Sequence, residues 1–296
     1  MGICSNQIVF SKMKVAGKST AIFNHMTKLR EFSRQIFGEG YSKWILLLPS
    51  LILLAFFALP LIALVYRSIA PDFFANALSK QAFQALKLSL VTSTITTLVT
   101  VLLGTPLAYL LARWKFRFKA WLELILDLPI VLPPSVAGLA LLIAFGRRGL
   151  FGVFLNEMGI SIPFTTIAVI MAQMFVAAPL YVRSARIGFA HVDKQLEESA
   201  YVEGANQWQL FYEVMIPIAI RALASGAILT WTRALGEFGA TILFAGNLEG
   251  VTQTMPIAIY IGFERNLGVA LALSVVLIVV SVILLMITKQ LEKEEE

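Results

Sequence analysis

The stretch that decides the fold is Leu88–Ala112, which reads LSLVTSTITTLVTVLLGTPLAYLLA and holds no charged residue over 25 positions. A helix of about 20 residues crosses the roughly 30 Å of hydrocarbon in a bilayer. The stretch lacks the strict alternation of a half-buried strand, and lipid tolerates no open sheet edge. It therefore predicts a transmembrane α-helix.

Five further apolar stretches flank this one, and composition agrees with a membrane protein. Of the 296 residues, 58% are apolar and 14% are charged, against about 45–50% and about 25% in soluble domains. These values exclude disorder and leave too few charges to cover a soluble domain. The predicted fold class is all-α: a polytopic membrane protein with six transmembrane helices. The predicted spans are Trp44–Tyr66, Leu88–Ala112, Trp121–Phe145, Pro163–Val182, Ile218–Leu243 and Leu267–Thr288.

Lysine and arginine are distributed unevenly among the predicted loops. With the N-terminus inside, 16 of the 24 lie in cytoplasmic segments and six lie in outer loops. Because cytoplasmic loops are enriched in Lys and Arg, both termini are expected in the cytoplasm. The predicted organisation is a basic cytoplasmic tail over 1–43, a six-helix transmembrane domain over 44–288 with a cytoplasmic loop at 184–217, and a cytoplasmic tail over 289–296.

The N-terminal tail is basic and has no acidic residue before Glu31. We interpret it as an inner juxtamembrane segment, with Met26 as an alternative start and a plastid transit peptide as an alternative role. The string GKST at 17–20 looks like the end of a phosphate-binding loop, but the first glycine of that motif would fall at Lys12 and no strand precedes it. No nucleotide is therefore expected to bind this chain. With one cysteine and two histidines, no metal site or catalytic cluster emerges.

The loop between the fourth and fifth spans carries the most specific local signals, and it predicts two short helices. Asp193 is a good N-cap for the first helix, and Gly204 suits the left-handed residue that ends it. Asn206 begins the second helix with Gln209 at the third position, as in a capping box. Pro217 is expected to end this surface helix where the fifth span begins.

Two aromatic residues on the second helix suggest a surface for a partner. Trp208 and Phe211 are three residues apart, so they are expected to share one exposed face. Capped helices with an exposed Trp and Phe favour a docking element for a cytoplasmic protein. The alternative is that the helices lie in the lipid headgroup layer.

The same loop carries a family resemblance. Glu198-Ser199-Ala200, Gly204 and Val214-Met215-Ile216-Pro217 resemble the E-A-A-x-x-x-G-x9-I-x-L-P loop of ABC importer permeases, with departures at Ser199, Val214 and Ile216. The resemblance implies the type I importer permease fold and coupling helices that sit in a groove of a cytoplasmic ABC ATPase subunit. It also implies that this chain is non-catalytic and that the partner uses ATP–Mg. The implied docking residues are Glu198, Ser199, Ala200, Gly204, Asn206, Gln207, Trp208, Phe211 and Pro217.

Other stretches resemble the molybdate branch of the oxyanion permeases: LPIVLPPSVAG at 128–138, GRRG at 146–149, RALGEFGAT at 233–241 and AGN at 245–247. Sulfate and tungstate permeases are close relatives. The resemblance implies transport of a tetrahedral oxyanion across the inner membrane, with molybdate foremost and sulfate or tungstate as alternatives. The implied partners are an extracytoplasmic oxyanion-binding protein, the ATPase and a second permease copy, expected as a homodimer in a lipid membrane without nucleic acid.

Two features place charge or a broken helix inside a predicted span. Arg233 and Glu237 lie four residues apart on one helix face, and we assign them to a gate or its support, with a structural ion pair as the alternative. Pro133 and Pro134 break the third span, which we interpret as a packing kink, with a half-helix from Ser135 that would offer N–H groups to an anion as the alternative. Pro133, Pro134 and Ser135 are therefore candidates for the translocation pathway or gate. An ion-gradient-driven secondary transporter and a membrane-embedded enzyme are rival functions.

Overall fold

The computed structural model describes residues 47–293, apart from the side chains of residues 284 and 287–293. Every regular element in this range is helical, so the all-α prediction is confirmed there. The predicted tail over 1–43, the string at 17–20 and the start of the first span at Trp44 lie outside the described residues. The chain divides into two units, 1–64 and 65–296. The apolar helix Leu47–Ser68 begins in the first unit.

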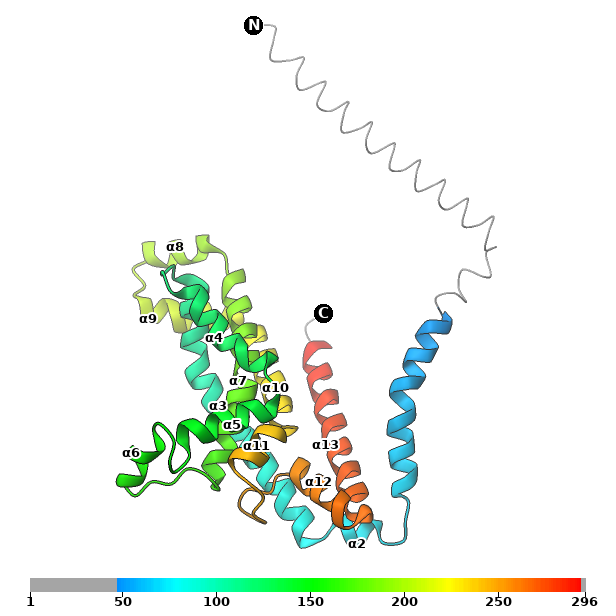
Figure 1. The fold of residues 1–296 in the computed structure, drawn as a ribbon. Helices are drawn as coiled ribbons and strands as arrows, with labels where there is room; N and C mark the ends of the chain where they lie inside the picture. Colours follow the sequence, from blue (N-terminus) through cyan, green and yellow to red (C-terminus); the bar gives the residue numbers. More distant parts are fainter. Residues whose placement is uncertain (1–46, 294–296) are drawn as a thin grey trace, which may run out of the picture. The chain divides into compact units, whose positions relative to one another are not determined.

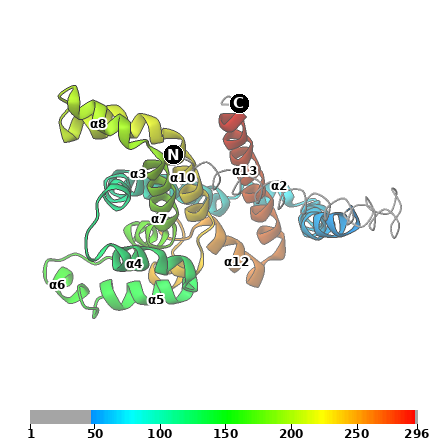
Figure 2. The ribbon, with the colours of Figure 1, turned by 90° about the horizontal axis from the view of Figure 1, so that it is seen from above.

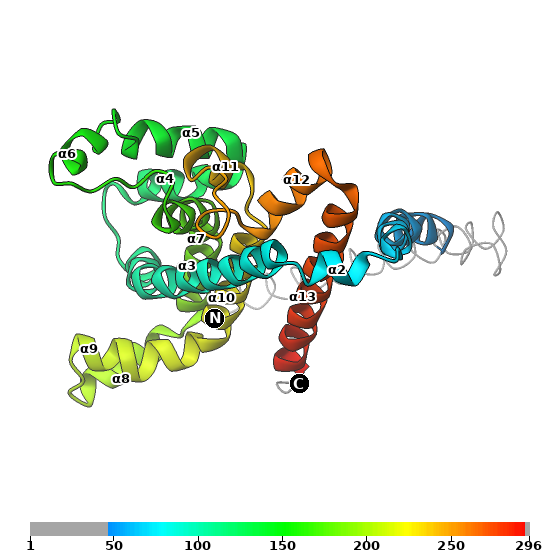
Figure 3. The same ribbon diagram turned by 90° about the horizontal axis from the view of Figure 1, so that it is seen from below.

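The second unit is a set of packed helices (Figure 1). Helices α3, α7 and α10 form its centre, with α8 and α9 at one end and α2 at the other. Views from above and below show α5 and α6 on one side of this centre and α12 and α13 on the other (Figures 2 and 3). The elements are α2 Phe73–Ala77, α3 Lys80–Arg113, α4 Lys119–Val131, α5 Pro134–Phe145, α6 Gly152–Glu157, α7 Thr166–His191, α8 Lys194–Val202, α9 Gln207–Gln209, the π-helical segment η1 Leu210–Met215, α10 Ile216–Leu235, α11 Gly239–Phe244, α12 Met255–Arg265 and α13 Leu267–Lys293.

Small residues bring the central helices close together. A Cβ at Gly226 of α10 would lie 2.9 Å from Cβ of Ser184 on α7, and one at Gly104 of α3 would lie 2.9 Å from the Tyr181 ring. The Ser184 hydroxyl donates to the carbonyl of Ala222, at 2.8 Å. In a bilayer, where apolar burial does not drive helices together, close backbone approach and interhelical hydrogen bonds supply the attraction. The centre is therefore a tightly packed membrane bundle.

The candidate membrane spans follow the predicted order. Among the described residues, four helices are long and apolar enough to cross a bilayer: Leu47–Ser68, α3, α7 and the continuous helix Gln207–Leu235. They match the first, second, fourth and fifth predicted spans. The pair α4 and α5 corresponds to the third span, and the apolar part of α13, Leu267–Ile283, to the sixth. The count of six and the side on which the termini lie remain predictions.

Several predicted boundaries are wrong because tertiary packing extends or ends the helices. Helix α3 begins about two turns before Leu88, where the Ser79 hydroxyl accepts a hydrogen bond from the N–H of Ala82. Helix α7 continues past Val182 to His191, since its last turns are buried in the core through Phe189. Residues 184–191, expected in the loop, therefore belong to this helix.

The third predicted span consists of two helices, and the chain bends by 119° between them. The expected break at Pro133 and Pro134 is confirmed, with Pro133 as N-cap and Pro134 in the first turn of α5. Each proline removes a backbone N–H donor and disfavours a helical residue before it, and two in succession end the helix here. The bend is much sharper than a packing kink. Helix α5 then packs on α11, where a Cβ at Gly138 would lie 2.7 Å from the carbonyl oxygen of Ala240.

Candidate functional site

We call residues 193–217 the docking loop; it contains α8, α9 and η1. The Asp193 carboxylate accepts a hydrogen bond from the N–H of Gln195 at 3.0 Å and caps α8. The helix ends in a Schellman motif: Gly204 has φ +90°, its N–H donates to the carbonyl of Tyr201, and the N–H of Ala205 donates to that of Ala200. Both predicted caps are confirmed. Nothing lies within 4 Å of a Cβ at Gly204, so the backbone conformation, rather than space, requires glycine.

The predicted capping box is also present. The Asn206 side chain accepts hydrogen bonds from the N–H groups of Trp208 at 3.0 Å and Gln209 at 2.9 Å. In return the Gln209 side chain accepts from the N–H of Asn206 at 2.9 Å. These reciprocal bonds satisfy donors that a helix start otherwise leaves unpaired. They fix the angle at which the chain enters the second helix.

The prediction that Pro217 ends the second helix is wrong. Helical structure runs without interruption from Gln207 to Leu235. Just before the proline, the N–H of Ile216 donates to the carbonyl of Phe211, five residues back, as in a π-helix. A π-helical turn rearranges the carbonyl groups near the proline ring, so the helix accommodates Pro217. The docking loop is therefore joined to α10 by one continuous helix.

Phe211 does not share an exposed face with Trp208, contrary to prediction. The Phe211 side chain is only 8% exposed and its ring centre lies 4.9 Å from that of Tyr109 and 6.2 Å from that of Phe189. Trp208 is 70% exposed and stacks on Tyr212. The side of the helix that carries Phe211 packs against α3 and α7. The buried Phe211 ring therefore holds the docking loop against these two helices.

The remaining predicted docking residues are accessible. Ala200 is partly buried. The exposed residues are Glu198, Ser199, Gly204, Asn206, Gln207, Trp208 and Pro217. Apolar side chains of Leu196, Val202 and Tyr212 are exposed beside them. An exposed set of aromatic and aliphatic side chains on two capped helices is suited to a protein partner.

Arg113, the last residue of α3, anchors the docking loop and was missed by sequence reasoning. Its Nε atom lies 2.8 Å from Oε1 of Glu197 on α8, and its Nη2 donates to the carbonyl of Val192 at 2.7 Å. Both side chains are largely buried. The planar guanidinium can make both contacts at once, which a lysine cannot. The sequence offers only a basic residue at the end of a span, a common feature of cytoplasmic boundaries.

A second ion pair outside the predicted set holds α4 against α7. Nη1 of Arg186 lies 2.6 Å from Oε1 of Glu123, and Lys119 is 4.0 Å from the same oxygen. The pair connects the first half of the broken third span to the helix that leads into the docking loop.

Arg233 and Glu237 form the predicted ion pair, with Nη1 2.7 Å from Oε2. The prediction that Glu237 lies within the fifth span is wrong, because α10 ends at Leu235 and α11 begins at Gly239. Glu237 is 1% exposed in this break, and its Oε1 accepts from the N–H of Ala240 at 2.9 Å. The carboxylate therefore joins the end of α10 to the start of α11.

The two predicted gate features lie side by side. A Cβ at Gly239, two residues after Glu237, would lie 2.8 Å from Cβ of Pro134. Pro133, Pro134 and Ser135 are exposed at the start of α5. The break between α4 and α5 is thus in contact with the break between α10 and α11.

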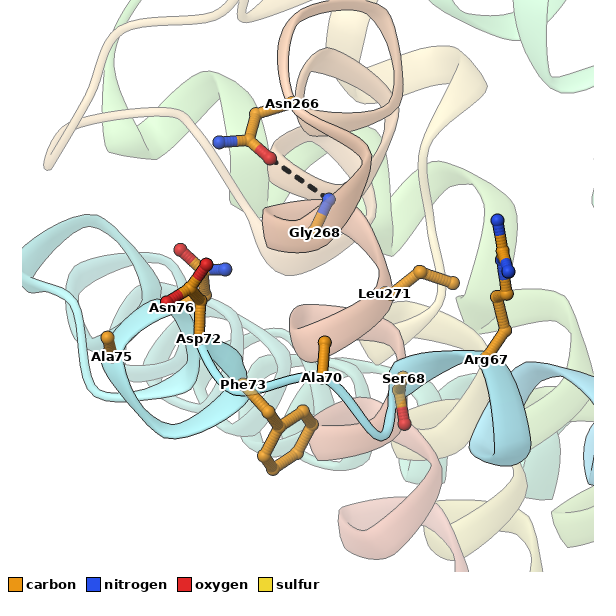
Figure 4. Close-up of a pocket in the computed structure, with 10 residues that line it drawn as sticks. All are labelled: Arg67, Ser68, Ala70, Asp72, Phe73, Ala75, Asn76, Asn266, Gly268 and Leu271. Atoms are coloured by element: carbon orange, nitrogen blue, oxygen red, sulfur yellow. Dashed lines mark hydrogen bonds between the residues drawn. The ribbon is translucent and has the colours of Figure 1, made fainter.

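A cavity of about 260 Å³ lies beside α2 (Figure 4). This end of the unit is opposite the docking loop (Figure 1). The cavity is lined by the end of the first helix and the segment after it, by α2 and by the start of α13, with Arg67, Asp72 and Asn76 among its polar residues. The Asn266 side chain accepts from the N–H of Gly268 at 3.0 Å and caps α13 there. The predicted site residues do not line this cavity.

Known transport proteins are similar to this chain in sequence and in fold. ModB, a molybdenum transport system permease protein of Mycobacterium tuberculosis, is 40% identical over 82% of this chain and 92% of its own length. NifC, a probable transport system permease protein of Clostridium pasteurianum, is 35% identical over 88% and 96%. A chain of a bacterial ABC transporter that imports alginate has the same fold, with a TM-score of 0.71, 18% identity and coverage of 88% and 99%.

The resemblance to importer permeases found in the docking loop and the gate motifs is thereby confirmed. The family model described as "Binding-protein-dependent transport system inner membrane component" matches residues 104–294. The chain belongs to this family.

Proposed function

We propose that this chain is the transmembrane permease subunit of an ABC importer and that its substrate is molybdate. The observation that carries the proposal is the docking loop: two capped helices with exposed Trp208, continuous with the membrane helix Gln207–Leu235. The relative named as a molybdenum permease supports the substrate. Sulfate and tungstate are tetrahedral oxyanions of the same charge and are the alternatives.

The partner at the docking loop is a cytoplasmic ATP-hydrolysing subunit. Glu198, Gly204 and the exposed turn at Asn206–Trp208 contact it, while Phe211 keeps the loop rigid beneath them. The partner binds ATP–Mg, and this chain catalyses no reaction. An oxyanion-binding protein on the outer side delivers the substrate, and a second copy of this chain completes the pathway.

Movement passes from the docking loop into the membrane by two rigid connections. One is the continuous helix into α10; the other is the Arg113–Glu197 ion pair to α3. When ATP closes the partner subunits, the loop moves with them and the helices rock between inward- and outward-open states. The joined breaks at Glu237 and Pro134 lie at the end of α10 and form the gate or support it. The chain lowers the barrier to crossing but supplies no free energy.

The family description names an inner membrane component, which supports a multi-pass location in the inner membrane. The plastid alternative has no support. The outer end of the molecule, where the cavity beside α2 lies, then faces the binding protein.

Uptake by the reconstituted transporter tests this function. Gly204→Asp should abolish ATP-driven molybdate uptake and stimulation of the ATPase while the protein still inserts, because Asp strains the left-handed position and places a charge on the docking surface. Gly159→Asp is the matched control, since Gly159 also has a positive φ, +76°, and open space around it. Normal uptake with Gly204→Asp, or uptake driven by an ion gradient without ATP, would contradict the proposal.

The substrate is tested in the same vesicles. Molybdate should be taken up in preference to sulfate when the binding protein is present. Preferential sulfate or tungstate uptake would assign the chain to the alternative substrate and leave the docking proposal intact.

A further inference from the structure

The connection between α3 and α4 alternates aromatic and basic residues: it reads WKFRFKAW over 114–121. The side chains of Trp114, Phe118 and Trp121 are all more than half exposed. Trp side chains prefer the boundary between water and hydrocarbon, because the indole ring is apolar and its N–H group is polar. We call residues 114–121 the aromatic–basic segment.

The two acidic residues closest to this segment in the ion-pair network, Glu197 and Glu123, already form ion pairs with other basic residues. Glu197 is held by Arg113, and Glu123 by Arg186, with Lys119 at 4.0 Å. Lys115 and Arg117 are exposed, and neither forms an ion pair with any side chain that the structure describes. Two cations are therefore available to an anionic ligand beside three exposed rings.

Helix α4 continues the apolar side of the segment. Trp121, Leu124, Ile125 and Leu128 are exposed at the spacing of one helix face. Glu123 lies on another side of the helix, toward Arg186 of α7. The exposed face suits acyl chains, and the aromatic–basic segment at its start suits the headgroups above them.

The segment lies at the same end of the bundle as the docking loop, because Arg113, which directly precedes it, binds Glu197 of α8. In the proposed orientation this end is cytoplasmic. The cytoplasmic leaflet carries anionic lipids, which attract basic residues close to the membrane. Charge and location therefore agree.

We propose that the aromatic–basic segment binds the headgroup of an acidic phospholipid in the cytoplasmic leaflet. Lys115 and Arg117 contact the phosphate, while Trp114, Phe118 and Trp121 lie at the glycerol level. This site is separate from the docking surface and rests on the proposed orientation alone. A lipid held here sits directly against the Arg113 end of α3, which anchors the docking loop.

The test is a lipid competition with the purified full-length chain and no ATPase. Native mass spectrometry measures retention of phosphatidylglycerol against phosphatidylcholine at equal concentration. Removing two interfacial cations weakens binding of an anionic lipid at this site by about 30-fold, or about 5-fold for each cation. The double variant Lys115→Gln/Arg117→Gln should lose most of the preference for phosphatidylglycerol, and high salt should weaken the preference in the unaltered chain.

Two control variants make the result specific. Arg147→Gln/Arg148→Gln removes two exposed arginines elsewhere and should leave the preference unchanged. Lys115→Arg/Arg117→Lys keeps both charges and should also keep the preference. Fluorescence quenching by brominated phosphatidylglycerol should fall in Trp114→Phe/Trp121→Phe, which tests the location.

Three outcomes would overturn the proposal: equal preference in Lys115→Gln/Arg117→Gln and the unaltered chain, complete displacement of the lipid by inorganic phosphate, or an effect of these residues that is absent from the chain alone and appears only in a parallel measurement with the ATPase added. The last outcome would assign the segment to the protein partner. Because transport is not measured, failure here leaves the importer proposal standing.

Discussion

At the scale of residues, Gly204 and Gly138 are required for opposite reasons. Gly204 has a positive φ and open space around it, whereas Gly138 has an ordinary helical backbone but no room for a side chain next to Ala240. Only the first requirement is visible in the sequence, because a glycine after a capped helix is a local signal. The second depends on α11, which lies about a hundred residues away, and could not be predicted.

Removal of the Glu237 carboxylate should destabilise the fold. It is buried, paired with Arg233 and hydrogen-bonded to the N–H of Ala240. Glu237→Ala leaves the N–H of Ala240 without its buried acceptor, which costs about 1–3 kcal/mol, while Arg233, whose side chain is 35% exposed, can bind water instead. Glu237→Gln keeps an oxygen for the N–H and should cost less. Thermal unfolding of the purified variants measures this order.

A double-mutant cycle provides the control for this prediction. Arg233→Gln/Glu237→Gln removes both charges and should be less damaging than the sum of the two single changes, because no charge is left unpaired. Additive effects of the two substitutions would contradict the coupling.

At the scale of elements, signals confined to a few residues were predicted correctly and those set by packing were not. The caps at Asp193, Gly204 and Asn206 were found because each bonds to a backbone group within five residues. The burial of Phe211 was missed because Tyr109 and Phe189 come from other helices. Spacing identifies residues that share a helix side, but the neighbouring helices decide which side is covered.

Helix α8 should loosen when its anchor to α3 is removed. Arg113→Gln loses the charged contact to Glu197 and the bond to the Val192 carbonyl. Hydrogen bonds of charged groups contribute about 1.5–3 kcal/mol, so amide exchange in α8 should become about 10- to 100-fold faster. Hydrogen–deuterium exchange measures this. Lys194→Gln, an exposed change on the same helix, is the control, and unchanged exchange in Arg113→Gln would refute the anchoring role.

At the scale of the whole molecule, composition and the length and pattern of the apolar stretches predict an all-helical membrane protein, but not the sharp turn of the third span. The positions of Lys and Arg in the loops predict which side faces the cytoplasm. The 119° bend depends on α5 packing against α11, a contact that no local pattern encodes. The transport mechanism then rests on a single arrangement: a surface loop continuous with a membrane helix.

Site-specific cross-linking tests the central claim, that a cytoplasmic ATPase binds this loop. Val202 of α8 is 88% exposed and its cysteine variant, in a Cys4→Ser background, should cross-link to the ATP-binding subunit and resist thiol reagents applied from outside. Val153→Cys in α6, also exposed, is the control and should react only from outside. Labelling of Val202→Cys from outside, or cross-linking of Val153→Cys to the ATPase instead, would contradict the account.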